Sequence, residues 1–306
     1  MELERVRGII TTIKTFATHD GPGIRTTIFL KGCPLRCLWC SSPETWEKNP
    51  QIYFKAEKCV DCGECVRACP RNAVTMNKER KILRELCDLC MKCVEACKYG
   101  ALEIVGREVS AGEIMEEVVK DKVFYERSGG GVTLSGGEPL YQPDFTLALA
   151  KLCRRESISV VLDTSGYASP RWVEEIAKNI DMALLDIKHM DPVKHKEMTG
   201  VSNELILENA KLMVKKCEVR ISLPLIPGLN NTLENLKRTA EFARSLGVEA
   251  IDIVPFHRLG SHKYRFLGMT SPLSKFRVPS EAEIREAMEF IEAYGLKTTK
   301  GRMIAS

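Results

Sequence analysis

The residues of this 306-residue chain with the clearest chemical potential are its cysteines. There are 13, and all but two fall between Cys33 and Cys97. Dense cysteines in a short secreted chain usually form disulfides, but this chain is long and its charged start, Met1 to Arg7, lacks the apolar segment of a signal peptide. In such a chain, closely spaced cysteines more often bind metal. We expect the two isolated cysteines, Cys153 and Cys217, to be buried structural residues.

Two sets of four cysteines share one spacing. Each set reads C-x2-C-x2-C-x3-C, the first from Cys59 to Cys69 and the second from Cys87 to Cys97. In proteins with two iron–sulfur clusters, the fourth cysteine of each such run binds the other cluster. The spacing therefore predicts one [4Fe-4S] cluster on Cys59, Cys62, Cys65 and Cys97, and another on Cys87, Cys90, Cys93 and Cys69. Structural zinc is the alternative, but it usually takes two separated pairs of ligands.

Three further cysteines, Cys33, Cys37 and Cys40, have the spacing C-x3-C-x2-C. Three thiolates on a four-iron cube leave one iron open, and an open metal position can take a substrate. A structural zinc ion or a redox dithiol could also use three cysteines. The spacing resembles that of the radical S-adenosylmethionine (SAM) superfamily, in which the amino and carboxylate groups of SAM chelate the open iron. The resemblance implies that these three cysteines hold a catalytic [4Fe-4S] cluster.

Short apolar runs that alternate with helical patterns must position these cysteines. We predict strands at residues 25–31, 132–135, 158–163, 182–188, 218–223 and 250–254. Most are rich in Val, Ile and Leu, which is typical of parallel strands buried on both faces. The pattern predicts an α/β fold, a parallel sheet or an incomplete (β/α)6 barrel built from residues 1–49 and 105–306, with ligands at the carboxyl ends of the strands. The cysteine-rich residues 50–104 interrupt it as a ferredoxin-like insertion.

Polar segments at the ends of these strands resemble those of the radical SAM superfamily. Ser135-Gly136-Gly137-Glu138-Pro139 resembles the segment that lines the amino group of SAM. The residues that the resemblance implies in SAM binding are Trp39, Gly136, Gly137, Glu138, Asp163, Thr164, Ser165, Asp186, Lys188, Arg220 and His257. The segments of Asp163 and Asp186 also hold a monovalent cation in some members. Simpler roles stay open, since a glycine pair can form a turn, an aspartate can cap a helix, a lysine can be a solvated charge and a lone histidine is usually structural.

Other segments narrow the resemblance to the activating enzymes of glycyl radical enzymes. They are Asp20 to Arg25, Ser128 to Thr133, Gly200 to Asn203 and Pro227 to Asn230. The resemblance implies reductive cleavage of SAM to a 5′-deoxyadenosyl radical, which abstracts an α-hydrogen from a glycine of a partner enzyme. The insertion resembles that of the subgroup acting on glycerol- or choline-type lyases and arylacetate decarboxylases. The implied partners are a glycyl radical enzyme and an external reductant such as flavodoxin or ferredoxin, and the implied cofactors are SAM and three [4Fe-4S] clusters.

Composition narrows the function classes further. The formal net charge of +4 is small and no long basic run occurs, so a nucleic-acid partner is not indicated. No apolar run approaches the ~20 residues that span a membrane. We therefore expect an anaerobic, cytoplasmic oxidoreductase that is a monomer. Two alternatives stay open: a radical SAM enzyme that acts on a small molecule, and a ferredoxin-type electron carrier with a large accessory domain.

Overall fold

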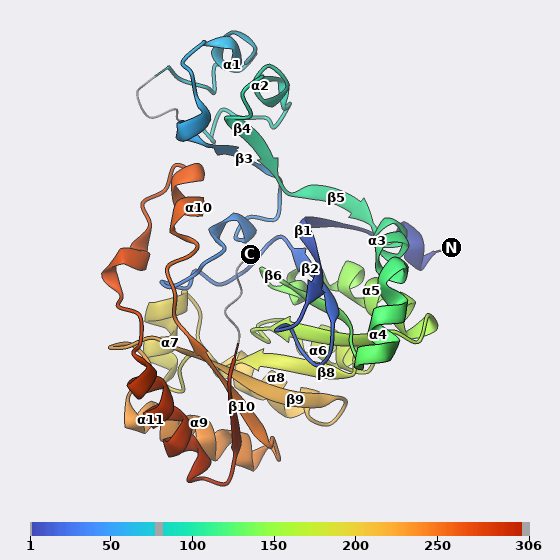
Figure 1. Cartoon of the computed structure of the whole chain (residues 1–306), viewed down its shortest axis with the longest axis vertical. Helices are drawn as coiled ribbons and strands as arrows, with labels where there is room; N and C mark the ends of the chain where they lie inside the picture. Colours follow the sequence, from blue (N-terminus) through green and yellow to red (C-terminus); the bar gives the residue numbers. More distant parts are fainter. Residues whose placement is uncertain (1, 77–81, 302–306) are drawn as a thin grey trace.

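The computed structural model describes residues 2–76 and 82–301, and its main feature is one large, mostly parallel sheet (Figure 1). The strand order is β11-β10-β9-β8-β7-β6-β2-β1-β5. The parallel strands are β2 (Arg25–Leu30), β6 (Gly131–Gly136), β7 (Ser159–Thr164), β8 (Met182–Asp186), β9 (Glu218–Leu225), β10 (Ala250–Pro255) and β11 (Lys297–Lys300). Two antiparallel strands, β1 (Arg7–Ala17) and β5 (Arg107–Ser110), extend the sheet beyond β2.

All six predicted strands are present, parallel, and within two residues of their predicted bounds. The parallel run nevertheless has a seventh strand, β11, and the sheet is open, with β11 and β5 as its edges. The sequence Lys-Thr-Thr-Lys of β11 is mostly exposed and contains no apolar run. Hydrophobic patterning therefore could not identify this edge strand.

Alternation along the parallel strands gives the sheet an outer and an inner face. On the outer face, Ile28, Leu134 and Leu185 are fully buried in a large apolar cluster. The helices packed in this cluster are α3 (Ala111–Val118), α4 (Lys122–Ser128), α5 (Pro143–Arg155), α6 (Pro170–Ala177), α8 (Glu204–Met213), α9 (Leu233–Ser245) and α11 (Glu281–Glu292). Capping boxes start α3 and α11 at Ser110 and Ser280. Among the helices of residues 2–76 and 82–301, none is both long enough and apolar enough to cross a membrane.

The inner face combines polar residues with a small apolar cluster of Val161, Met182 and Leu184, and a buried arginine closes its amino end. Arg25 is fully buried, and its guanidinium donates to Thr133 Oγ1 at 2.8 Å and to the carbonyl oxygens of Pro22 and Ser159, both at 3.0 Å. The hydroxyl of Thr133 in turn donates to the carbonyl of Asp20 over 2.6 Å. The Asp20 to Arg25 segment, one of those that resemble the activating enzymes, therefore packs against the amino end of the inner face and closes it.

The insertion, residues 50–104, forms a separate lobe beyond one end of the main sheet (Figure 1). Its elements are β3 (Gln51–Phe54), α1 (Glu64–Arg67), α2 (Lys92–Glu95) and β4 (Leu102–Val105), with β3 and β4 paired antiparallel. The lobe has its own small core of Ile52, Val74 and Leu102, against which most of its cysteines pack. Its residues 77–81 lie outside the described part of the chain.

Candidate active site

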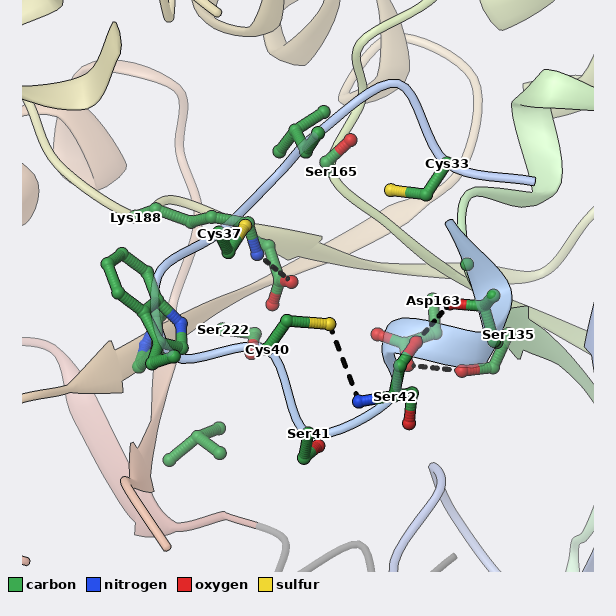
Figure 2. Close-up of a pocket in the computed structure, with 18 of the residues that line it drawn as sticks. Cys33, Cys37, Cys40, Ser41, Ser42, Ser135, Asp163, Ser165, Lys188 and Ser222 are labelled. Atoms are coloured by element: carbon green, nitrogen blue, oxygen red, sulfur yellow. Dashed lines mark hydrogen bonds and ion pairs between the residues drawn. The ribbon is translucent and has the colours of Figure 1, made fainter. Parts of the chain in front are cut away.

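A cavity of about 220 Å³ lies at the carboxyl ends of β6 to β10. Residues 33–40, here named the triad loop, follow β2 and form one wall of it (Figure 2). The predicted site residues that line this cavity are Cys33, Cys37, Trp39, Cys40, Gly136, Gly137, Asp163, Thr164, Ser165, Asp186, Lys188 and His257. Segments that lie far apart in the sequence therefore meet where ligands bind in parallel α/β sheets.

The three triad cysteines all border the cavity (Figure 2). Burial raises the pKa of the Cys33 and Cys37 thiols, and it raises the pKa of Cys40 to about 12. The Ser42 backbone N–H donates to the sulfur of Cys40 over 3.4 Å. Thiolates at such buried positions need positive charge beside them. Three soft sulfur ligands around one cavity thus fit an iron–sulfur centre.

Neighbouring backbone holds the triad loop on two sides. At its middle, the Arg36 N–H donates to the carbonyl of Thr199 over 2.7 Å, at the end of α7 (Pro192–Thr199). At its start, the Cys33 N–H donates to the carbonyl of Trp46 over 3.1 Å. The positions of the thiols are therefore set by fixed backbone bonds, as well as by the spacing of the cysteines.

Packing explains the glycine pair at the end of β6. Gly136 has a φ of +105°, which L side chains rarely adopt. A Cβ there would lie 2.4 Å from the carbonyl oxygen of Leu30, and a Cβ at Gly137 would lie 2.4 Å from that of Gly32. Both distances are far shorter than real contacts of a Cβ atom. The glycines thus let β6 approach the start of the triad loop, which brings the backbone of both segments to the same cavity.

Glu138, the acidic residue of the same segment, is buried beside the cavity and is absent from its described lining. Its carboxylate accepts hydrogen bonds from Thr164 Oγ1 at 2.6 Å, from the Ser165 N–H at 2.8 Å, and from the Ser165 hydroxyl. Burial raises the pKa of this carboxyl, while the bonds from Ser165 and Thr164 oppose that effect. Glu138 therefore positions two cavity-lining residues, and the structure does not bring it to the cavity surface.

Charged and polar side chains from β6, β7 and β8 form the floor of the cavity. The Lys188 ammonium donates to the Asp186 carboxylate over 2.6 Å, and the Ser135 hydroxyl donates to Asp163 over 2.7 Å. Although burial opposes its charge, Lys188 has a raised pKa because Asp186 and Cys37 lie close to it. Lys188 in turn acts to lower the pKa of Cys37, against the larger effect of burial. A positively charged side chain thus lies beside one triad sulfur.

Arg220 is the second predicted site residue outside the described cavity lining. Its guanidinium forms an ion pair with Asp252, with Nε donating over 3.1 Å, and both residues line a different cavity that includes Met182 and Glu218, the first residues of β8 and β9. Inward-facing residues recur every second position, so Ser222 and not Arg220 reaches the cavity at the carboxyl end of β9. Assigning Arg220 to a strand was therefore insufficient, because its position along that strand decides which of the two cavities its side chain reaches.

The sequence interpretation did not include several residues of the cavity wall. Trp46 and Ser222 both line it, and Trp46 lies just beyond the triad loop. His257, which the sequence did identify, lies at the same cavity, and burial lowers its pKa, so that its ring is neutral near pH 7. The alternation of β9 could have identified Ser222. No comparable signal marked Trp46, because its place depends on how the chain returns after the triad loop.

The eight cysteines of the insertion gather around two smaller cavities. One cavity is lined by Cys59, Cys62, Cys65 and Cys97, and the other by Cys69, Cys87, Cys90 and Cys93. These are the two sets expected from the spacing, including the exchange of the fourth cysteine. Within the part of the chain that the structure describes, no three His, Cys, Asp or Glu side chains are grouped to hold one metal ion. A [4Fe-4S] cluster is larger than a single ion, so its thiolate ligands lie farther apart than those of a one-ion site.

Comparison with known proteins supports one family. Residues 27–243 match the radical SAM superfamily. The chain is 38% identical over 306 residues to the indoleacetate decarboxylase activating enzyme of Tractidigestivibacter scatoligenes, covering 96% of this chain and 97% of that protein. It is 39% identical over 298 residues to the trans-4-hydroxy-L-proline dehydratase activating enzyme of Clostridioides difficile, covering 96% and 99% respectively. The fold resembles that of Streptococcus suis SuiB bound to precursor peptide SuiA, with a TM-score of 0.50 and 15% identity over 87% of this chain and 46% of that one.

Proposed function

The chain belongs to the radical SAM superfamily and, within it, to the activating enzymes of glycyl radical enzymes, and from this premise we propose how its cavity serves that activity. Cys33, Cys37 and Cys40 hold the catalytic [4Fe-4S] cluster, and the rest of the cavity holds SAM. When bound, these groups supply a 5′-deoxyadenosyl radical by one-electron cleavage of SAM, and this radical takes an α-hydrogen from a glycine of the partner. The observation that carries the proposal is that all three thiols border one cavity at the ends of five strands.

The side chains of the cavity wall have distinct roles in this proposal. Lys188 offsets the negative charge of the thiolates, most directly at Cys37. Gly136 and Gly137 let the end of β6 pack closely, which exposes backbone polar groups to the amino end of SAM. Trp39 and the neutral His257 also line the cavity and offer flat rings against which the adenine of SAM can stack. The chain therefore contributes positioning, charge and shelter from water.

The insertion forms the second part of the proposal. Its two sets of four cysteines each hold a [4Fe-4S] cluster, which gives three clusters in total and places the chain in the ferredoxin-like subgroup. The support is the grouping of each set around its own cavity. Cys62 and Cys90 are exposed, so an external reductant such as flavodoxin or ferredoxin can deliver electrons at the surface of the insertion.

Further features complete the proposed working form. Asp163 and Asp186 are the cavity-lining carboxylates proposed for a monovalent cation, because carboxylate oxygens suit hard cations, and the cation would share Asp186 with the Lys188 ammonium. The protein works as a monomer until its partner docks. It works in the anaerobic cytoplasm, where thiols stay reduced and available to metal.

The direct test follows hydrogen from the partner to the nucleoside. The reduced protein and SAM are incubated with a glycyl radical enzyme encoded beside it, whose glycine α-hydrogens are replaced by deuterium. We expect a glycine-centred radical by electron paramagnetic resonance (EPR) and deuterium in 5′-deoxyadenosine. Cleavage of SAM without deuterium transfer, with every such neighbour, would favour a small-molecule substrate. An absence of any 5′-deoxyadenosine would leave only an electron carrier.

A further inference from the structure

Helix α10 (Ser261–Phe266) lies between the insertion and the main sheet (Figure 1), and its Tyr264 contacts the triad loop. The hydroxyl of Tyr264, which is only 1% exposed, donates to the carbonyl oxygen of Cys40 over 2.8 Å. Just before the helix, a Cβ on Gly260 would lie 2.0 Å from the carbonyl oxygen of Ser41. The helix is therefore in direct contact with the backbone that carries the last triad cysteine.

A buried ion pair holds the same helix against the segment that follows the triad loop. The Lys263 ammonium lies 2.8 Å from Glu44 Oε1, and the two side chains are 10% and 8% exposed. The backbone carbonyl of Glu44 also accepts a hydrogen bond from the buried ammonium of Lys31, at the end of β2. An ion pair this buried has a fixed geometry, because separating the charges would leave both without compensation. The orientation of α10 relative to the triad loop is thus well defined.

Helix α10 also contacts the insertion. The ring of Phe266 packs edge-to-face on Tyr53 of β3, with centroids 5.4 Å apart, and the Lys55 ammonium lies 5.7 Å from its centroid. The guanidinium of Arg84, beyond the first cysteine set, donates to the carbonyl of Leu267 over 2.9 Å. One six-residue helix therefore contacts Cys40 through Tyr264, and the insertion through Phe266 and the Leu267 carbonyl that follows it.

We propose that Tyr264 is a positioning residue for the catalytic cluster, and that α10 couples the insertion to Cys40 through it. The inference rests on the proposed function, since it assigns Cys40 to that cluster. The insertion fixes α10 through Phe266 and Arg84, and α10 fixes the Cys40 peptide through the Tyr264 hydroxyl. Groups that orient a ligand and the peptides around it tune the redox potential of an iron–sulfur centre. Docking of a reductant on the insertion therefore has a direct mechanical route to the triad.

The first test measures backbone hydrogen exchange in the reconstituted holoenzyme. Tyr264→Phe removes only the hydroxyl, and we expect exchange in the peptide containing Cys40 to become roughly two- to tenfold faster, the range for loss of one hydrogen bond. The matched control is Tyr125→Phe, which removes another buried tyrosine hydroxyl that donates to Thr26 over 2.7 Å. This control should leave the Cys40 peptide unchanged. Equal exchange in Tyr264→Phe and the wild type would overturn the positioning role.

The second test asks whether the insertion acts through α10. Arg84→Ala changes an exposed residue and should fold, and we expect faster exchange at the Cys40 peptide and a shifted potential for the EPR signal that responds to SAM. Lys58→Ala, another exposed cation of the insertion, should change neither. An unchanged potential and exchange in Arg84→Ala would refute the coupling. Wild-type protein that cleaves SAM normally in that same experiment would show that only the coupling, and not the proposed function, had failed.

Discussion

The carboxylate of Glu138 accepts a hydrogen bond from the backbone N–H of Ser165 over 2.8 Å, which joins the end of β6 to the end of β7. A second bond, from Thr164 Oγ1 at 2.6 Å, strengthens the same link. Both partners line the catalytic cavity, whereas Glu138 is fully buried beside it. The acidic residue of the glycine-rich segment therefore shapes the cavity from behind.

Glu138→Gln tests this positioning role. An amide cannot accept all of these hydrogen bonds, and its NH2 group would face donors, so we expect the free energy of unfolding to fall by about 1–3 kcal/mol. The affinity for SAM should fall as well, because Thr164 and Ser165 would shift. Chemical denaturation and equilibrium dialysis measure the two effects. Glu156→Gln, at an exposed carboxylate, is the control, and equal behaviour of the two variants would contradict the role.

Arg25→Met tests the closure of the inner face. The change keeps most of the side-chain volume but removes every donor to Thr133, Pro22 and Ser159. Each buried acceptor left without a donor costs about 1–3 kcal/mol, so we expect the free energy of unfolding to fall by about 3–5 kcal/mol for the three together. Arg127→Met, at an exposed position, should cost little. A loss below about 1 kcal/mol for Arg25→Met would show that the closure is dispensable.

His195 gives the fold a specific pH dependence. It is buried in α7, burial lowers its pKa below the ordinary 6.5, and its Nδ1–H donates to the carbonyl of Val201 over 2.7 Å. Since the unfolded chain then binds the proton more readily, stability is complete above pH 6.5 and falls as the pH drops through and below it. Protonation of His195 lowers the free energy of unfolding by up to about 1.4 kcal/mol for each pH unit.

The measurement is urea denaturation of the wild type and His195→Gln between pH 5 and 8. The difference between their free energies of unfolding should shrink towards the acid side, because only the wild type loses stability by protonation at this position. His189 and His257 also have lowered pKa values, but they are present in both proteins and cancel in the difference. A difference that stays constant with pH would contradict the assignment.

Much of the fold was predictable because its signals are local. Each of the six buried parallel strands contains a short apolar run, and the motifs at the strand ends follow directly in sequence. The edge strand β11 was not predictable, since its exposed residues are held by pairing with β10 and carry no pattern of their own. Hydrophobic patterning identifies a strand by its buried apolar side chains, and β11 has none.

The sequence predicted that the site lies at the ends of the strands, but it did not predict which residues near those ends reach the cavity. Of the fourteen residues predicted for the catalytic cluster and for SAM binding, twelve line the cavity, whereas Arg220 lies one inward-facing position too early on β9 and Glu138 points into the core. Contacts between distant segments were also invisible: nothing in the sequence links Tyr264 to Cys40, or Thr199 to Arg36. Such contacts depend on how the chain returns after each strand.

Iron content and SAM cleavage together separate the catalytic cysteines from those of the insertion. The anaerobically reconstituted protein should bind about twelve irons, four for each of three clusters. Replacing Cys33, Cys37 and Cys40 with alanine should leave about eight irons and abolish 5′-deoxyadenosine formation even with dithionite, because no open iron remains to bind SAM. The matched variant replaces Cys87, Cys90 and Cys93, and it should also retain about eight irons. That variant should still cleave SAM with dithionite, because the triad loop belongs to the main sheet and a small reductant needs no relay through the insertion. If the first variant kept all of its iron, the three thiols around the cavity would not form a cluster site.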